Sequence, residues 1–173
     1  MTTTYTARPI PPAALAELRR TDDAGRPCVP YTATEEDGAG NPLRCCLRLV
    51  EAGERIALVS YAPLRRWAAQ TGAEPGAYDE QGPVFIHADA CEGPETTPGP
   101  HPYPFARPGA LRTLRRYDAQ GRIVGGRLLE IPDPPTEGFD RAFAAAFADP
   151  AVALVHVRAV EYGCFHYEVH RPG

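Results

Sequence analysis

Short apolar runs fill most of the chain after residue 43, and polar residues that favour turns separate them. Runs of roughly four to eight residues bounded by Gly, Pro, Asn or Asp are typical of β-strands. We predict seven strands, at 44–50, 55–61, 83–89, 111–118, 122–131, 152–158 and 164–170. The links at 51–54 and 118–121 have the length and composition of hairpin turns, so neighbouring strands are expected to pair antiparallel.

Three other segments follow the period of an α-helix: 12–20, 63–70, and the stretch from Thr136 to the Asp149-Pro150 pair. In the last segment Phe139, Phe143 and Phe147 recur at every fourth position, which predicts a buried stripe. Trp67 is expected to anchor a core in the same way. The pattern therefore favours an α+β fold, mainly an antiparallel sheet of about seven strands with two or three short helices.

One compact domain is expected overall. Residues 1–42 hold the first helix and an acidic connecting segment, and residues 43–173 form the α+β domain. Residues 93–109 contain six prolines, which suits neither a central strand nor a helix interior. Because long loops inside compact domains often carry function, this segment is a candidate wall of a binding site.

Composition excludes several mechanisms. The chain has 173 residues and a net charge of −4, and all 18 of its basic residues are arginine. Without lysine, neither a Schiff base nor a phosphate-loop lysine is available. The lone serine, Ser60, lacks the glycine-flanked turn of a serine hydrolase. The negative charge also argues against a nucleic-acid partner.

The N-terminal residues, the lack of long apolar runs and the cysteines indicate the expected cellular compartment. Residues 1–12 show no charged leader followed by an apolar stretch, and no run of about eighteen apolar residues occurs. We therefore expect a cytoplasmic protein without a membrane partner. The five cysteines are odd in number and irregularly spaced, so free thiols are expected rather than a disulfide framework.

From about residue 43 the chain resembles the bacterial domain-of-unknown-function family numbered 1203. The resemblance is carried by Arg44, Cys46 and Leu47 before Gly53-Glu54, Gly82 to Ile86, Arg115 with Tyr117 to Gly121, Phe147 to Pro150 leading to His156, and Gly163-Cys164-Phe165. It spans roughly three-quarters of the chain. It implies a small bacterial protein of unassigned function and supplies no reaction.

The last two predicted strands offer a candidate catalytic face. If a connection at 160–162 joins them, His156 lies opposite His166 and Arg158 lies opposite Cys164. A thiol beside a guanidinium and two imidazoles could form a Cys/His nucleophile pair. In the alternative interpretation, Cys164 is a small packing residue and His156 is a core histidine.

A metal site is a weaker hypothesis. His87, Cys91 and His101 begin at a strand end and run into the proline-rich loop, where they could converge as ligands. Their spacing matches no known zinc motif, so we expect no metal and no other cofactor. Since Cys45 and Cys46 are adjacent in a predicted strand, they are expected to point to opposite faces, so that at most one joins any site.

Arginines on strands indicate anion binding. Cys46 alternates with Arg44 and Arg48 in a predicted strand, so these three side chains could share a face that binds an anion. In the alternative interpretation, this face is simply exposed to solvent. The predicted ligand-binding residues are Arg44, Cys46, His87, Arg115, Tyr117 and Arg158. The first functional hypothesis is a protein that binds a small polar or anionic molecule in a pocket bordered by arginines and the proline-rich loop. The alternatives are a small enzyme using Cys164, His156 and His166 or a His/Cys metal site, and a protein-interaction module.

Overall fold

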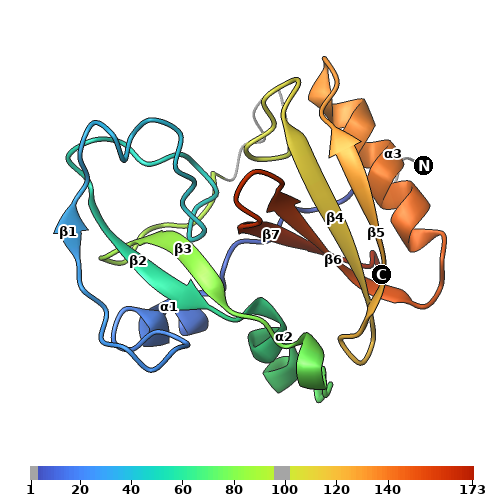
Figure 1. Cartoon of the computed structure of the whole chain (residues 1–173), viewed down its shortest axis with the longest axis horizontal. Helices are drawn as coiled ribbons and strands as arrows, with labels where there is room; N and C mark the ends of the chain where they lie inside the picture. The colour runs from blue at the N-terminus through green and yellow to red at the C-terminus, as the bar shows by residue number, and fades with distance from the viewer. Residues whose placement is uncertain (1–3, 96–101) are drawn as a thin grey trace.

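Two antiparallel sheets and three α-helices make up the computed structural model, which describes residues 4–95 and 102–173 (Figure 1). The first sheet has the order β1-β2-β3, with β1 Tyr31–Thr32, β2 Arg55–Tyr61 and β3 Gly82–His87. The second has the order β5-β4-β6-β7, with β4 Leu111–Asp118, β5 Ile123–Glu130, β6 Val152–Ala159 and β7 Phe165–His170. The helices are α1 Pro12–Leu18, α2 Pro63–Thr71 and α3 Pro135–Phe147, and a short 3-10 helix spans Gly76–Tyr78. The α+β class is confirmed, with the strands divided between two sheets.

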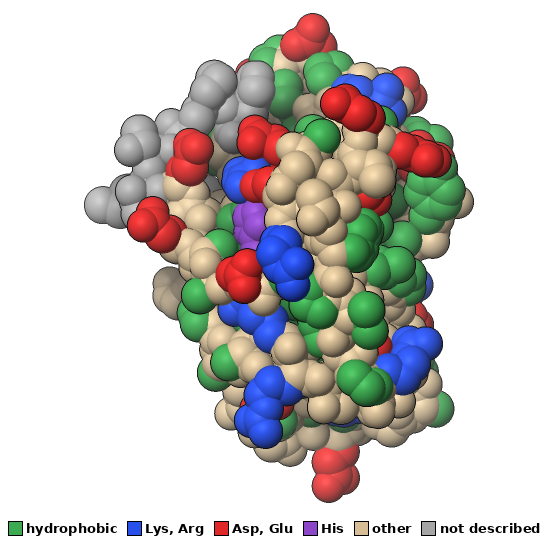
Figure 2. All heavy atoms as spheres, turned by 90° about the vertical axis from the view of Figure 1, so that its left-hand side faces the viewer, with side chains coloured by type: hydrophobic (Ala, Val, Ile, Leu, Met, Phe, Trp, Pro, Cys, Tyr) green, Lys and Arg blue, Asp and Glu red, His purple; other side chains and the backbone are tan. Residues whose placement is uncertain are grey.

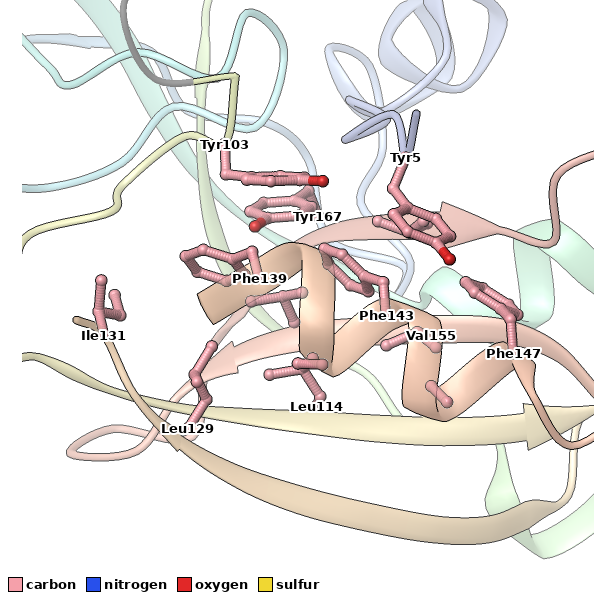
Figure 3. Packing of buried hydrophobic residues seen from close by; sticks show 14 of the residues in the cluster. Tyr5, Tyr103, Leu114, Leu129, Ile131, Phe139, Phe143, Phe147, Val155 and Tyr167 are labelled. Atoms are coloured by element: carbon pink, nitrogen blue, oxygen red, sulfur yellow. The ribbon is translucent and has the colours of Figure 1, made fainter. Parts of the chain in front are cut away.

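Helix α3 covers one face of the second sheet (Figure 1). As predicted, Phe139, Phe143 and Phe147 are buried on one side of the helix. They pack against Val155 of β6 and Tyr167 of β7, among other apolar side chains (Figure 3). The spacing of four residues places these rings on the side of the helix that faces the sheet, so their burial fixes the position of the helix.

The first sheet has its own core. Leu15 and Leu18 of α1 are buried against Ile56 of β2 and Ile86 of β3. Trp67 of α2 is buried in a third, smaller cluster together with residues of the second sheet, as its size predicted. Helix α2 therefore contributes to the contact between the two sheets.

The strand predicted at 44–50 is wrong, because this segment forms a tight turn. The backbone N–H of Leu47 donates to the carbonyl of Leu43 over 3.0 Å, and the N–H of Leu43 donates to Arg48 over 2.8 Å. Leu47 has a φ of 60°, a left-handed conformation that a strand does not contain. Because the chain turns here, the alternation assumed for Cys45 and Cys46 does not apply.

The predicted pairing within the last hairpin is also wrong. His156 lies opposite Glu168 rather than His166, and a bulge sets Arg158 opposite Phe165. The shift of His156 by two residues preserves the parity of the pairing at this point, and the apolar side chains of Val155, Val157, Tyr167 and Val169 are buried together.

The connection between β6 and β7 explains this difference. It spans residues 160–164, where three residues were predicted, and the N–H of Ala159 donates to the carbonyl of Cys164 over 3.0 Å. Gly163 has a φ of 69°, which suits a glycine in a turn. Cys164 therefore belongs to the connection and is not paired with Arg158.

Within residues 4–95 and 102–173, no helix is both long and apolar enough to cross a membrane.

Candidate functional site: a Cys/His cluster and an arginine-lined cavity

Three thiols and one imidazole converge beside the first sheet. We call Cys45, Cys46, His87 and Cys91 the Cys/His cluster, and their sulfur and nitrogen atoms all lie within 4.8 Å of one another. The tight turn places both adjacent cysteines in it, His87 ends β3, and Cys91 follows four residues later. Two residues of the predicted metal set, His87 and Cys91, thus meet. The third, His101, lies outside the described residues.

His87 connects two cysteines of the cluster to a carboxylate outside it. Its Nδ1 lies 3.4 Å from the sulfur of Cys45 and 3.9 Å from that of Cys46, and its backbone N–H donates to the Cys45 sulfur over 3.3 Å. Its other ring nitrogen, Nε2, lies 3.0 Å from Oε1 of Glu54. Arg48 forms an ion pair with the same carboxylate. The surface on this side of the molecule shows histidine, basic and acidic side chains next to one another (Figure 2).

The surroundings favour charged forms at the edge of the cluster. The hydrogen bond from Cys45 lowers the pKa of the Cys46 thiol to about 6, against the effect of burial. Burial raises the pKa of Glu54, but hydrogen bonds from Arg48, the Glu51 backbone and His87 outweigh it and hold that pKa at about 2. The surroundings therefore shift both groups toward their charged forms.

A second feature is a cavity of about 200 Å³ between the two sheets. Its walls come from the end of β2, the start of β3, the end of β6 and the start of β7. The lining residues with polar or reactive side chains include Tyr61, Glu80, Gln81, Arg158 and Cys164. Phe165 contributes an aromatic wall. The proline-rich loop, as far as residues 93–95 and 102–109 are described, is not part of the lining; its Tyr103 instead packs on α3.

Arg158 is the cation of this cavity. Only 9 % of the residue is exposed, yet its contacts are weak. Its Nη1 donates to the carbonyl of Gly163 over 3.2 Å, its Nη2 lies 3.8 Å from Oε2 of Glu80, and its Nε has no partner among the described residues. Arg115 shares Glu80 through a contact of 2.8 Å. Arg158 therefore retains capacity to bind an anion.

The predicted catalytic residues are not brought together as a set. Cys164 lines the cavity, where its sulfur contacts the carbonyl of Tyr162 at 3.7 Å. His156 is fully buried, with its Nε2 3.4 Å from Glu168, a distance of an ion pair rather than a good hydrogen bond. His166 is buried against the ring of Phe105, with a centroid distance of 5.1 Å.

Both histidines are held neutral by their surroundings. Burial lowers the pKa of His156, which Glu168 opposes. Burial, with the charges of Arg44 and Arg112, lowers the pKa of His166 to about 3. Neither imidazole forms a hydrogen bond with the Cys164 sulfur among the described residues, so the nucleophile pair lacks its base in this arrangement.

The other predicted ligand-binding residues are distributed around these two features. Arg44 is buried, and its Nε donates to the carbonyl of Phe165 over 2.7 Å. Tyr117 is buried beside the ring of His156, with centroids 4.7 Å apart. Arg115 forms an ion pair with Glu80, which lines the cavity. Cys46 and His87 belong to the Cys/His cluster.

Sequence reasoning missed several residues of the two features, among them Cys45, Glu54 and Glu80. The sequence predicts Cys45 on the strand face opposite Cys46, and it places Glu54 in a hairpin turn. One signal could have found the first: the Cys45-Cys46 pair and the His87/Cys91 spacing are two half-sites, each with two soft ligands. No local signal indicated Glu54, because its contact with His87 depends on the pairing of β2 with β3.

Comparison with known proteins gives one family. A family model described as a protein of unknown function, DUF1203, matches residues 40–171. No match was found among curated proteins or among solved structures. The matched region includes the Cys/His cluster and every residue named above as lining the cavity. The chain belongs to the DUF1203 family.

Proposed function

We propose that the protein binds a small anionic molecule, such as a carboxylate, in the cavity between the sheets, with Arg158 as its main contact. The observation that carries this proposal is the nearly buried guanidinium of Arg158. Its Nε lacks a partner in the part of the chain that the structure describes, and its ion pair with Glu80 is 3.8 Å long. A buried cation without a close counter-ion is costly, and an anion in the cavity would offset that cost.

The size of the cavity limits the ligand. About 200 Å³ would hold roughly six water molecules at their liquid volume, which suits a molecule of a few heavy atoms. Tyr61, Gln81 and Cys164 add polar groups to the walls, so a ligand could be oriented as well as neutralised. Inorganic phosphate, malonate and acetate are small anions of three different shapes, and they serve as the probes for this cavity.

Binding is better supported than cysteine chemistry. Cys164 is in the cavity, but His156 and His166 contact other groups. An enzyme that uses Cys164 would need a base from the ligand or from solvent. We propose a cytoplasmic location, with which five free thiols are compatible.

Calorimetric titration with these three anions tests the proposal. We expect at least one to bind the native protein, and Arg158→Gln to weaken that binding about tenfold or more. Arg127→Gln, which removes an exposed arginine from β5, is the matched control and should bind as the native protein does. Equal affinities in Arg158→Gln and the native protein, or no binding of any of the three anions, would reject the proposal.

A further inference from the structure

We propose that Cys45, Cys46, His87 and Cys91 bind one Zn²⁺ ion in a closed tetrahedral site. This inference is independent of the anion proposal, since it concerns other residues. Thiolate and imidazole are the ligands that zinc prefers in structural sites, and three cysteines with one histidine form a known set. In this chain four such groups, from three separate segments, place one ligand atom each within 4.8 Å of the others.

The distances agree with a shared ion. Zn–S bonds of about 2.3 Å and Zn–N bonds of about 2.0 Å, set at tetrahedral angles, separate two sulfurs by about 3.8 Å and a sulfur from a nitrogen by about 3.5 Å. The sulfurs of Cys45 and Cys46 are 4.0 Å apart. Nδ1 of His87 lies 3.4 Å and 3.9 Å from those two sulfurs. For these three ligand atoms an ion can therefore enter with shifts of only a few tenths of an ångström, and the sulfur of Cys91 lies within 4.8 Å of each of them.

The groups outside the ligands also fit a metal. A histidine that binds zinc almost always donates its other ring N–H to a carboxylate, which fixes the tautomer. Here Nε2 of His87 lies 3.0 Å from Glu54 and 3.3 Å from Nη2 of Arg48. A proton on Nε2, donated to Glu54, would leave the Nδ1 lone pair toward the sulfurs. Arg48 pairs with Glu54 and lies close enough to Cys46 for their charges to interact. This cation would offset the excess negative charge of three thiolates around Zn²⁺.

The site would be structural rather than catalytic. All four coordination positions are taken by protein atoms, which leaves none for water or a substrate. The ion would join the turn after Leu43, the end of β3 and the segment that follows it. Among the described residues the first sheet has three strands, and β1 consists of two residues, so a crosslink here would add stability to a sheet with few backbone hydrogen bonds.

This inference reverses the expectation of a metal-free protein, which rested on the spacing of His87, Cys91 and His101. That set left one coordination position open and included His101, which lies outside the described residues. The tight turn supplies Cys45 and Cys46 instead, because in a turn, unlike a strand, adjacent side chains can face the same point.

Metal content tests the proposal directly. The full chain, purified without chelator and then exposed to excess Zn²⁺ and desalted, should carry about one zinc per chain by elemental analysis. Cys46→Ser and Cys91→Ser should each lose most of it, whereas Cys28→Ser, which removes a cysteine outside the cluster, should keep it. Native protein that retains no zinc, or iron in its place, would overturn the inference, as would full zinc content in both cluster variants.

Two further measurements guard against variants that fail to fold. X-ray absorption of the zinc-loaded native chain should show three sulfur ligands and one nitrogen ligand, and a shell of oxygen and nitrogen atoms only would reject the site. Glu54→Gln keeps all four ligands and should weaken zinc affinity about 10- to 100-fold in competition with a chromophoric chelator. An unchanged affinity would contradict the role assigned to the Glu54–His87 contact.

Discussion

The Cys/His cluster and the histidines of the second sheet contain the same kinds of side chain in different surroundings. In the cluster, sulfur atoms and Nδ1 of His87 face one another at 3.4 to 4.0 Å. In the second sheet, the ring of His156 lies among aromatic rings, 4.7 Å from Tyr117 and 5.1 Å from Phe165, and neither of its nitrogens has a hydrogen-bond partner among the described residues.

The difference shows which feature distinguishes a ligand from a core histidine. Both imidazoles are mostly buried, so burial alone does not separate them. The ring of His87 has a carboxylate on one nitrogen and thiols on the other, whereas His156 meets a carboxylate on one side and apolar surface on the other. A buried histidine is therefore best recognised as a metal ligand when other soft ligands face its free ring nitrogen.

Removal of zinc should produce the largest effect. At a free zinc concentration 1,000 times the Kd, binding would stabilise the folded chain by about 4.1 kcal/mol. For a chain of this size, loss of that energy lowers Tm by about 8 to 16 °C. Calorimetry with and without a strong chelator measures the shift.

The loss of stability on zinc removal should also be greater near the cluster than in the second sheet, which tests the difference between these two regions. Hydrogen exchange of the metal-free chain should accelerate in residues 42–50 and in β3 more than in β4 and β6, which α3 covers. Equal acceleration in both sheets would mean that the ion supports the whole fold, and an unchanged Tm would mean that the cluster holds no stabilising metal.

Arg44 joins the two regions, so its replacement should give the next largest effect. Its carbonyl and backbone N–H bond to the N-terminal segment and β3, while its side chain reaches the carbonyl of Phe165 in the second sheet. Burial lowers its pKa to about 10, which still leaves it charged at neutral pH. Arg44→Met should cost about 1.5 to 3 kcal/mol, because it removes a charged hydrogen bond and leaves a carbonyl unpaired.

Denaturant titration of this variant provides the measurement. Arg65→Met is the control, since Arg65 is half-exposed and pairs with Asp79 at the surface, where less than about 1 kcal/mol is expected. A loss no greater than the control's would show that the Arg44 contact does not hold the sheets together.

The comparison also explains how far the sequence could predict the molecule. The stripe of Phe139, Phe143 and Phe147 and the strands 111–118 and 152–158 were recognisable, because local periodicity determines which side faces a core. The tight turn at Cys45 was not, because Arg44 to Val50 alternates like a strand. Its conformation depends on contacts with β3 that lie about forty residues away.

The candidate sites were predicted only in part, for the same reason. Arg158 and Cys164 were found to line one cavity, but a longer link and a bulge separate them from the predicted partner His166. A register shift of two residues is invisible to alternation, because alternation constrains the parity of a register and not its value.

Acid should destabilise the chain through its buried histidines. The pKa of His166 is about 3 in the folded chain and about 6.5 when unfolded. Between these values the unfolded chain binds a proton that the folded chain does not, so the unfolding free energy falls as pH falls below about 6.5, by up to about 1.4 kcal/mol per pH unit. His166→Gln should flatten this dependence between pH 6.5 and 5, as measured by urea titration at each pH; an unchanged slope would show that His166 is not the group responsible.

The smallest expected effect concerns the mouth of the cavity. The carboxylate of Glu80 pairs with Arg115 and lies 3.8 Å from Arg158, where it competes with an incoming anion. Glu80→Gln keeps the shape and removes the charge, so anion affinity should rise, by up to about fivefold because the position is half-exposed. Glu130→Gln, at an exposed position on β5, should leave the affinity unchanged. A lower affinity in Glu80→Gln would mean that Glu80 helps to hold the ligand, and the guanidinium of Arg158 would then be half of a paired recognition site rather than a free cation.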